Sequence, residues 1–419
     1  MRLPWQLTHL KKMVRKAVCI TFPGLVFFTF HAILRLELYS GYYILHKERN
    51  CMLKVKFFIP MLFSVLVMFG CTGVPSGTQG DSNEEAKDSY DILVFGDTHF
   101  DSPDVRTNTE KLSGGRKKEM QRNFEVWQER MSAMLKAAGE RSKHNIAFAV
   151  QLGDLIQGDC GSKKLQTKSY QEALQHFTDE LKVPFYCVKG NHDIRGHGAA
   201  NAYKDYMLPW LQKSFGQETW HNTANHYLKY GNDLFIFFDS LQQDSLFVKE
   251  VLDKYPDVRH VFFLTHLPLL PCSFSQPDWI VFGNAKMAEK RRQLLQMLAE
   301  KDTIVLAAHI HRTALFQYEF PKGKIVQQTF FSMPEKSVPE SIDTLFEPDG
   351  GKFFSDSYCK SSVIKKSNAI IPDFKEFCRN FTIYKGVAGF YVLHVSEKSI
   401  TVDFYIGDYS KPVKTIRLR

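Results

Sequence analysis

Three short apolar segments each end in glycine followed by an acidic or amide residue, and this recurrence limits the fold of the chain. Residues 91–95, 145–152 and 183–188 are mostly apolar, and they precede Gly-Asp-Thr-His, Gly-Asp and Gly-Asn-His-Asp. Strands this apolar are expected to be covered on both faces. Helical patterns at 120–141 and 170–181 separate the segments. The alternation predicts an α/β layered core.

The same alternation continues toward the C-terminus. Further apolar segments lie at 234–238, 260–264 and 303–307, and helical patterns at 246–255 and 285–298 separate them. The last forty residues differ, because two strand-like runs at 389–395 and 400–406 flank a short polar turn. This hairpin predicts that the sheets are mixed rather than wholly parallel.

Polar residues follow the later strands as well. Thr265-His266 and Ala308-His309-Ile310-His311 come directly after apolar runs. Any one of these motifs has an ordinary explanation as a turn or a structural histidine. Five of them at strand ends, where α/β proteins build sites, indicate a metal centre. Its oxygen and nitrogen ligands, without thiolate, favour manganese, iron(II) or zinc.

In this order, the motifs resemble those of the calcineurin-like metallophosphoesterase superfamily over about residues 91–312. One departure is Ala308, where the superfamily usually has glycine; a methyl group is tolerated there if φ is negative. The resemblance implies an α/β fold, a four-layer α/β/β/α sandwich of two mixed sheets with flanking helices. We expect this phosphoesterase domain to span residues 91–419.

The resemblance also assigns roles to individual residues. One divalent metal would be held by Asp97, His99, Asp154 and His311, and a second by Asp154, Asn191, His266 and His309, so that Asp154 bridges them. The resemblance implies that a hydroxide bridging the two metals attacks phosphorus. His192 would steady the phosphoryl group or protonate the leaving oxygen, and Asp193 would orient the imidazole of His192.

The resemblance implies a phosphoester hydrolase but leaves the substrate open. Gly153 to Gly158 lacks the Asp-Arg-Gly of Ser/Thr protein phosphatases, and Gln157 stands near where purple acid phosphatases need a tyrosine. We expect a small phosphoester substrate. A phosphodiesterase or nuclease is the alternative, followed by a non-catalytic binding module on the same fold.

Two segments outside the motifs bear on substrate binding. The basic residues between 101 and 122 form either a lid over the site or a solvated loop, and Arg195 and His197 are candidate substrate contacts. The segment 341–381, rich in aromatic residues, either covers the cleft or packs on the domain.

The net charge of +9 suggests a nucleic-acid partner until its distribution is considered. Residues 1–70 hold ten basic and two acidic side chains, whereas residues 71–419 hold 44 and 43. The body of the chain is therefore almost neutral and shows no long basic stripe. Nucleic acid is not favoured as a partner.

The N-terminal region predicts export. Residues 1–51 are an upstream extension preceding the true start at Met52, or a membrane segment centred on the apolar run 17–34. Residues 52–70 have the pattern of a signal peptide. Cys71 ends a stretch resembling a bacterial lipoprotein box, and residues 71–90 would form a tether. We expect a lipoprotein of the cell envelope facing the periplasm or exterior, with a signal anchor as the alternative.

The cysteines indicate no disulfide framework. Five remain after Cys71, an odd number, and a pair between Cys359 and Cys378 stays open.

Overall fold

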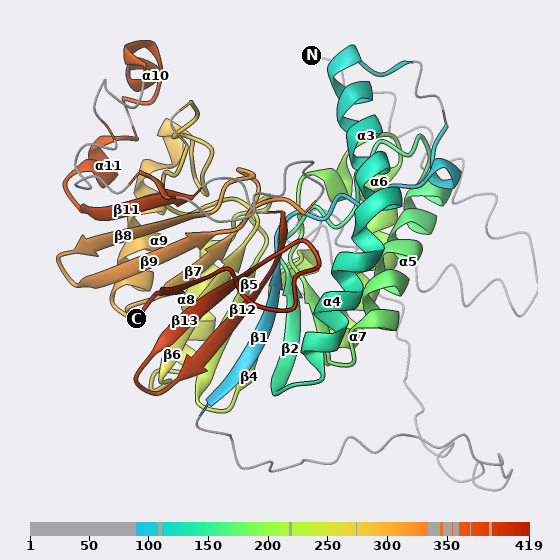
Figure 1. Cartoon of the computed structure of the whole chain (residues 1–419). Coiled ribbons are helices and arrows are strands. Elements are labelled where there is room, and N and C mark those ends of the chain that lie inside the picture. The colour runs from blue at the N-terminus through green and yellow to red at the C-terminus, as the bar shows by residue number, and fades with distance from the viewer. Residues whose placement is uncertain are drawn as a thin grey trace, which may run out of the picture. The chain divides into compact units, whose positions relative to one another are not determined.

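The apolar segments of the chain pair into two mixed β-sheets, as the sequence predicts (Figure 1). The computed structural model describes residues 89–107, 111–217, 220–273, 275–333, 344–346, 354, 360–368, 370–384 and 388–419. In the first sheet the strand order is β14-β13-β12-β1-β2-β3. Its members are β1 (Ser89–Phe95), β2 (Ile146–Gln151), β3 (Phe185–Cys187), β12 (Gly389–Ser396), β13 (Ile400–Ile406) and β14 (Lys414–Arg417). Strand β1 runs parallel to β2 and antiparallel to β12.

The second sheet has the strand order β10-β11-β8-β9-β7-β6-β5-β4. Its members are β4 (His226–Tyr230), β5 (Asp233–Phe238), β6 (His260–Thr265), β7 (Ile304–Ala307), β8 (Ala314–Phe320), β9 (Gly323–Thr329), β10 (Thr344–Phe346) and β11 (Cys378–Tyr384). Strands β5, β6 and β7 are mutually parallel, whereas β8 and β9 form an antiparallel hairpin.

Helices cover the outer face of each sheet (Figure 1). Those beside the first sheet are α3 (Gly114–Val126), α4 (Ser132–Ser142), α5 (Lys163–Glu180), α6 (Ala199–Ala202) and α7 (Leu208–Phe215). Those beside the second are α8 (Ser245–Lys254) and α9 (Ala288–Ala299), and the short α10 (Ser361–Lys366) and α11 (Pro372–Lys375) follow β10 in the chain.

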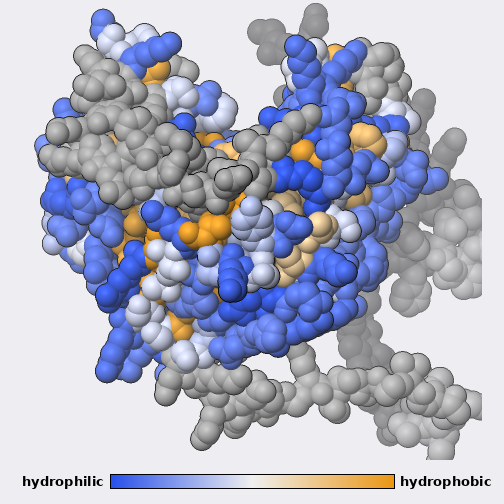
Figure 2. All heavy atoms as spheres, in the orientation of Figure 1, coloured by the Kyte–Doolittle hydropathy of each residue, from blue (hydrophilic) through white to orange (hydrophobic). Residues whose placement is uncertain are grey.

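The strands bury both of their faces, which explains why they are continuously apolar. On β1, Ile92 and Val94 point toward the second sheet, whereas Leu93 and Phe95 pack against the helices. Between the sheets, aromatic rings such as those of Phe148 and Phe235 meet edge to face at 5.1 Å. The result is the four-layer α/β/β/α sandwich, so the predicted fold class is confirmed. The face seen in Figure 2 is mainly hydrophilic, with hydrophobic residues exposed in small patches.

The described part of the segment 341–381 packs on the domain. Ile370 and Phe374 are buried in the core beneath the second sheet, and β11 pairs with β8. This finding supports packing on the domain over covering the cleft.

Several N-terminal predictions lie outside the described residues. They include the extension at 1–51, the signal peptide at 52–70, the lipidation of Cys71 and the tether as far as residue 88. Strand β1 starts at Ser89, so the last two residues of the proposed tether belong to the sheet. Cys359 also lies outside. Among the described helices, none has the length and apolar character needed to cross a bilayer.

Candidate metal centre

The candidate ligands gather where parallel strands of both sheets end. Asp97 and His99 follow β1, Asp154 follows β2, and Asn191 with His192 follows β3. His266 follows β6, and His309 and His311 follow β7. Backbone hydrogen bonds hold these loops together, because the amides of Thr98 and His99 donate to the carbonyl of Asp154 at 3.1 and 2.9 Å. The amide of His309 donates to Oδ1 of Asp97 at 3.1 Å and so connects the two sheets.

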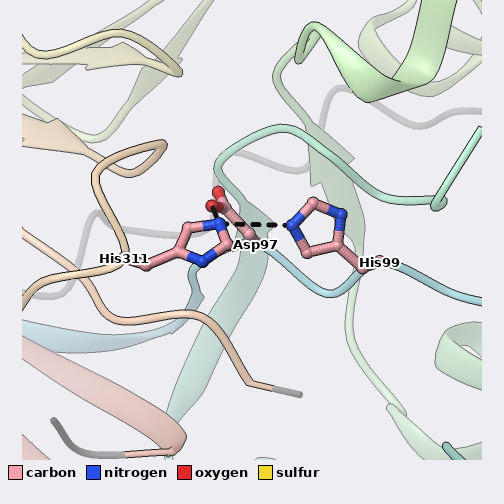
Figure 3. A group of neighbouring side chains, drawn as sticks. All are labelled: Asp97, His99 and His311. Atoms are coloured by element: carbon pink, nitrogen blue, oxygen red, sulfur yellow. Dashed lines mark hydrogen bonds and ion pairs between the residues drawn. The ribbon is translucent and has the colours of Figure 1, made fainter. Parts of the chain in front are cut away.

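The first group of ligands consists of Asp97, His99 and His311 (Figure 3). Oδ2 of Asp97 lies 2.7 Å from Nε2 of His311, and Nε2 of His99 lies 3.2 Å from the same nitrogen. Asp97 and His99 are fully buried, whereas the His311 side chain is 27% exposed. One carboxylate and two imidazoles therefore converge on a point that solvent reaches beside His311.

The second group consists of Asp154, His266 and His309, with Asn191 beside them. Nε2 of His266 is the centre of this group: it lies 3.3 Å from Oδ2 of Asp154, 3.1 Å from Nδ1 of His309 and 3.1 Å from Oδ1 of Asn191. Oδ2 of Asp154 is also 4.0 Å from Nε2 of His99. Asp154 therefore lies between the two groups.

Hydrogen-bond chemistry tests whether a cation fits these residues. Nδ1 of His266 lies 2.9 Å from the carbonyl oxygen of Leu152, which can only accept, so this nitrogen carries the hydrogen. In the neutral ring, Nε2 then directs a lone pair at the oxygens of Asn191 and Asp154, which are acceptors. A proton or a metal ion removes this repulsion, and the donor set suits a divalent metal.

The electrostatics of the pocket lead to the same conclusion. Burial lowers the pKa of His266, but the carboxylates of Asp154 and Asp97 outweigh it and raise that pKa to about 9. Burial and the neighbouring His266 lower the pKa of His309 to about 4. Burial, reinforced by His192, holds the pKa of His99 well below its usual range. At neutral pH, His99 and His309 therefore keep lone pairs that can bind a metal.

The backbone around the ligands is strained. His99, Asp154, His309 and His311 all have φ between 43° and 66°, a left-handed conformation that is uncommon for residues other than glycine. Ala308 is not among the residues with positive φ, so its methyl group is accommodated as expected.

Two glycines let the ligand loops approach one another. A Cβ at Gly190 would lie 2.0 Å from the Asp154 amide nitrogen, and one at Gly153 would lie 2.6 Å from Nδ1 of His266. These contacts are why glycine precedes the ligands in both motifs.

His192 is held differently from the sequence-based expectation. Its Nδ1 lies 3.0 Å from the carbonyl oxygen of Gln157 and donates to it, so Nε2 accepts from Nη1 of Arg195 at 2.7 Å. The Asp193 carboxylate instead accepts from the amides of Gly190 and Ile156, at 2.8 and 3.3 Å. Among the described residues, Asp193 makes no hydrogen bond to the imidazole of His192: it fixes the loop, and the carbonyl of Gln157 holds the ring.

The family is decided by a comparison of the sequence with family models. Residues 90–313, just over half of the chain, match the model described as calcineurin-like phosphoesterase. The chain belongs to this family. Members of the calcineurin-like phosphoesterase family use divalent metals, in agreement with the ligand groups described above.

Solved structures of similar fold have low sequence identity to this calcineurin-like phosphoesterase. GAP50, the anchor in the inner membrane complex of Plasmodium, has 13% identity and a TM-score of 0.40, covering 79% of this chain and 89% of its own. A dimetal phosphatase from Danio rerio has 12% identity and a TM-score of 0.44, and the match covers 78% of this chain and 98% of the Danio rerio chain. Purple acid phosphatase PPD1 from yellow lupin seeds has 11% identity and a TM-score of 0.44, and the match covers 78% of this chain and 53% of the lupin chain. No curated protein matches the chain significantly.

The two candidate substrate contacts are placed very differently. The guanidinium of Arg195 lies beside His192 and is braced by Asp159, with Nε 2.8 Å from the carboxylate, and by Glu119, 3.3 Å from Nη2. His197 is exposed on the following loop. The structure thus brings Arg195 to the ligand cluster, and no contact of His197 with that cluster is seen among the described residues.

The basic segment 101–122 is helical in its last part, because α3 starts at Gly114. Arg106 pairs with the buried Asp101, and Arg116 lies 3.3 Å from Asp159. These acidic partners reduce the positive field that a basic lid would provide.

The sequence did not indicate Glu119 on α3, or Asp159, as acidic residues beside the site. Oε1 of Glu119 lies 3.6 Å from Nε2 of His192, and its other oxygen contacts Arg195. Glu119 is the last acidic residue of the basic segment 101–122. Its position in the sequence does not indicate the site, because it is the packing of α3 that brings Glu119 beside His192.

Proposed function

We propose that this chain is a metal-dependent hydrolase of small phosphate esters. The observation that supports the proposal is the convergence of two ligand groups on Asp154 at the meeting edge of the two sheets. Each group combines one carboxylate with two imidazoles. Such a pair of sites suits two divalent ions, with manganese, iron or zinc as candidates.

Asp97, His99, His311 and Asp154 would hold one ion, and Asp154, Asn191, His266 and His309 the other. Bound there, two divalent ions would lower the pKa of a coordinated water and offset the charge of the phosphoryl oxygens. The chain's own contribution is to fix these ligands before substrate arrives, through the backbone bonds that connect the loops.

We assign His192 and Arg195 to the phosphoryl group. The lone pair at Nε2 of His192 accepts from Arg195, so the two side chains form one unit. Because Asp159 and Glu119 hold the guanidinium from the other side, Arg195 is pre-aligned to donate to phosphoryl oxygens. His192 then lies where it can exchange a proton with the substrate.

A panel of substrates tests the proposed function. With manganese, the purified full-length chain should hydrolyse p-nitrophenyl phosphate faster than its bis ester, because Arg195 is aligned to pair with the more highly charged monoester. It should also hydrolyse p-nitrophenyl phosphate faster than single-stranded DNA, because the body of the chain has balanced charge. Chelator-treated protein is the control and should be inactive until metal is restored. Activity confined to DNA would identify a nuclease, and inactivity with manganese, iron and zinc would identify a binding module; either result contradicts the proposal.

His192→Ala should lower turnover by about 10²- to 10⁴-fold, the usual contribution of a positioned acid or base. The metal content, measured by plasma mass spectrometry, should stay unchanged, since His192 is not assigned to either ion. His144→Ala removes an exposed histidine of the same domain and should leave turnover unaffected. Loss of metal from His192→Ala would show instead that this residue is a ligand.

A further inference from the structure

One exposed aromatic side chain lies next to a candidate metal ligand. Among the described residues, the large apolar side chains that are exposed are those of Leu246, Trp279, Met287 and Tyr409. Single exposed apolar residues are normal on a protein surface, so exposure alone carries no meaning. Trp279 differs in its position, because its ring centroid is 5.3 Å from that of His309. The indole is 44% exposed and is inclined at 42° to the imidazole.

The loop that carries Trp279 is firmly anchored. The next three residues, 280–282, are buried in the core beneath the second sheet. The amide of Val281 donates to the carbonyl of Pro268 at 2.8 Å, and that of Phe282 donates to Oε1 of Gln243 at 3.1 Å. The buried Arg291 donates to the Phe282 carbonyl at 2.7 Å. The indole is thus presented by a rigid frame, so ordering it on binding costs little.

Trp279 and Arg195 neighbour different parts of the ligand cluster. Arg195 contacts His192, whose ring lies 4.4 Å from that of His99. Trp279 contacts His309, whose ring lies 4.9 Å from that of His266. A phosphoester bound across both groups would meet a cation beside His99 and an aromatic surface beside His309.

We propose that Trp279 is a specificity residue that stacks against a planar aromatic ring in the alcohol part of the substrate. The inference rests on the proposed function, because it takes the phosphoryl group to bind at the ligand cluster. A single half-exposed indole offers one stacking surface, which suits one ring better than a protein partner, whose interface needs a larger buried core. The substrate class is therefore phosphate esters of aryl, benzyl or heteroaromatic alcohols.

Binding of phosphonates tests this proposal without hydrolysis. The manganese-loaded full-length chain is titrated by calorimetry with benzylphosphonate and with cyclohexylmethylphosphonate, which has matched charge and similar size. The aromatic compound should bind about three- to tenfold more tightly. Trp279→Ala should abolish this preference, Trp279→Phe should keep most of it, and Leu246→Ala, which removes another exposed apolar side chain, should not alter it.

Every other outcome contradicts the inference about Trp279, the proposed function or both. If Trp279→Ala weakens methylphosphonate as much as benzylphosphonate, Trp279 only positions His309 and the inference is wrong. If the wild-type chain hydrolyses esters without any preference for a ring, the inference fails and the proposed function stands. If it binds with ring preference but hydrolyses no ester, the proposed function fails, and Trp279 is a ring-binding residue of a binding module rather than a residue that selects a substrate. Binding of neither phosphonate overturns both.

Discussion

Asp154→Asn should reduce phosphoesterase activity by roughly 10³-fold, because a ligand shared by two ions supplies several kcal/mol of charge stabilisation. Asp154 lies between the two groups, with Oδ2 3.3 Å from Nε2 of His266 and 4.0 Å from Nε2 of His99. The metal content, measured by plasma mass spectrometry, should fall together with the activity.

The fold should survive this substitution. Oδ1 of Asp154 accepts from the amide of His192 at 2.7 Å, and the asparagine oxygen can accept the same bond. Asp205→Asn is the matched control, since it removes an exposed carboxylate paired with Lys163 and should change neither activity nor metal content. Full activity of Asp154→Asn with an unchanged metal content would contradict the assignment of Asp154 as the shared ligand.

A second measurement separates loss of charge from loss of structure. In the metal-free protein, the pKa of His266 is about 9 because the Asp154 and Asp97 carboxylates outweigh its burial. Asp154→Asn removes the larger of these two influences, so the pKa of His266, followed by NMR, should fall. An unchanged pKa would mean that Asp154 does not control the charge of the cluster.

The layered core could be predicted because burial on both faces leaves a continuous apolar run. Residues 234–238 are an example: alternate side chains pack against α8 and α9 on one side and against the first sheet on the other. The hairpin of β8 and β9 was not predicted, although β8 alternates buried residues with more exposed ones such as Gln317 and Glu319. Such alternation is itself typical of a half-buried strand, so the sequence contained this signal.

The ligand cluster could be predicted because its residues follow strands that the same apolar pattern marks. The surroundings of His192 could not be predicted in this way. Its ring is held by the backbone carbonyl of Gln157, and a carbonyl is present at every position of a sequence. Glu119 reaches the site from α3, so its place depends on how that helix packs. Trp279 lies in an irregular loop, where no periodicity indicates what its side chain contacts.

Arg291→Met should lower the free energy of unfolding by about 1 to 3 kcal/mol, because the Phe282 carbonyl loses its donor and Asp373 keeps only the exposed Arg292 as a partner. Arg291, on α9, is fully buried. Its Nε lies 3.0 Å from Oδ2 of Asp373 on α11, and Nη1 donates to the carbonyl of Phe282. One guanidinium therefore connects α9, α11 and the loop of Trp279.

Arg292 offers a matched control for this effect. It reaches the same carboxylate, with Nη1 3.3 Å from Oδ1 of Asp373, but its side chain is 54% exposed. An exposed pair contributes about 0 to 1 kcal/mol, so Arg292→Met should shift the midpoint of urea unfolding only slightly. Equal shifts for the two variants would show that burial does not set the strength of this contact.

A double variant separates the buried charge from the packing. Arg291→Met combined with Asp373→Leu removes both charges and should recover part of the lost stability, because neither partner is then left uncompensated. It does not restore the bond to Phe282, so the loop of Trp279 should remain less firmly held. If Trp279 selects aromatic substrates through this rigid frame, the double variant should be stable and still show a weaker preference for benzylphosphonate.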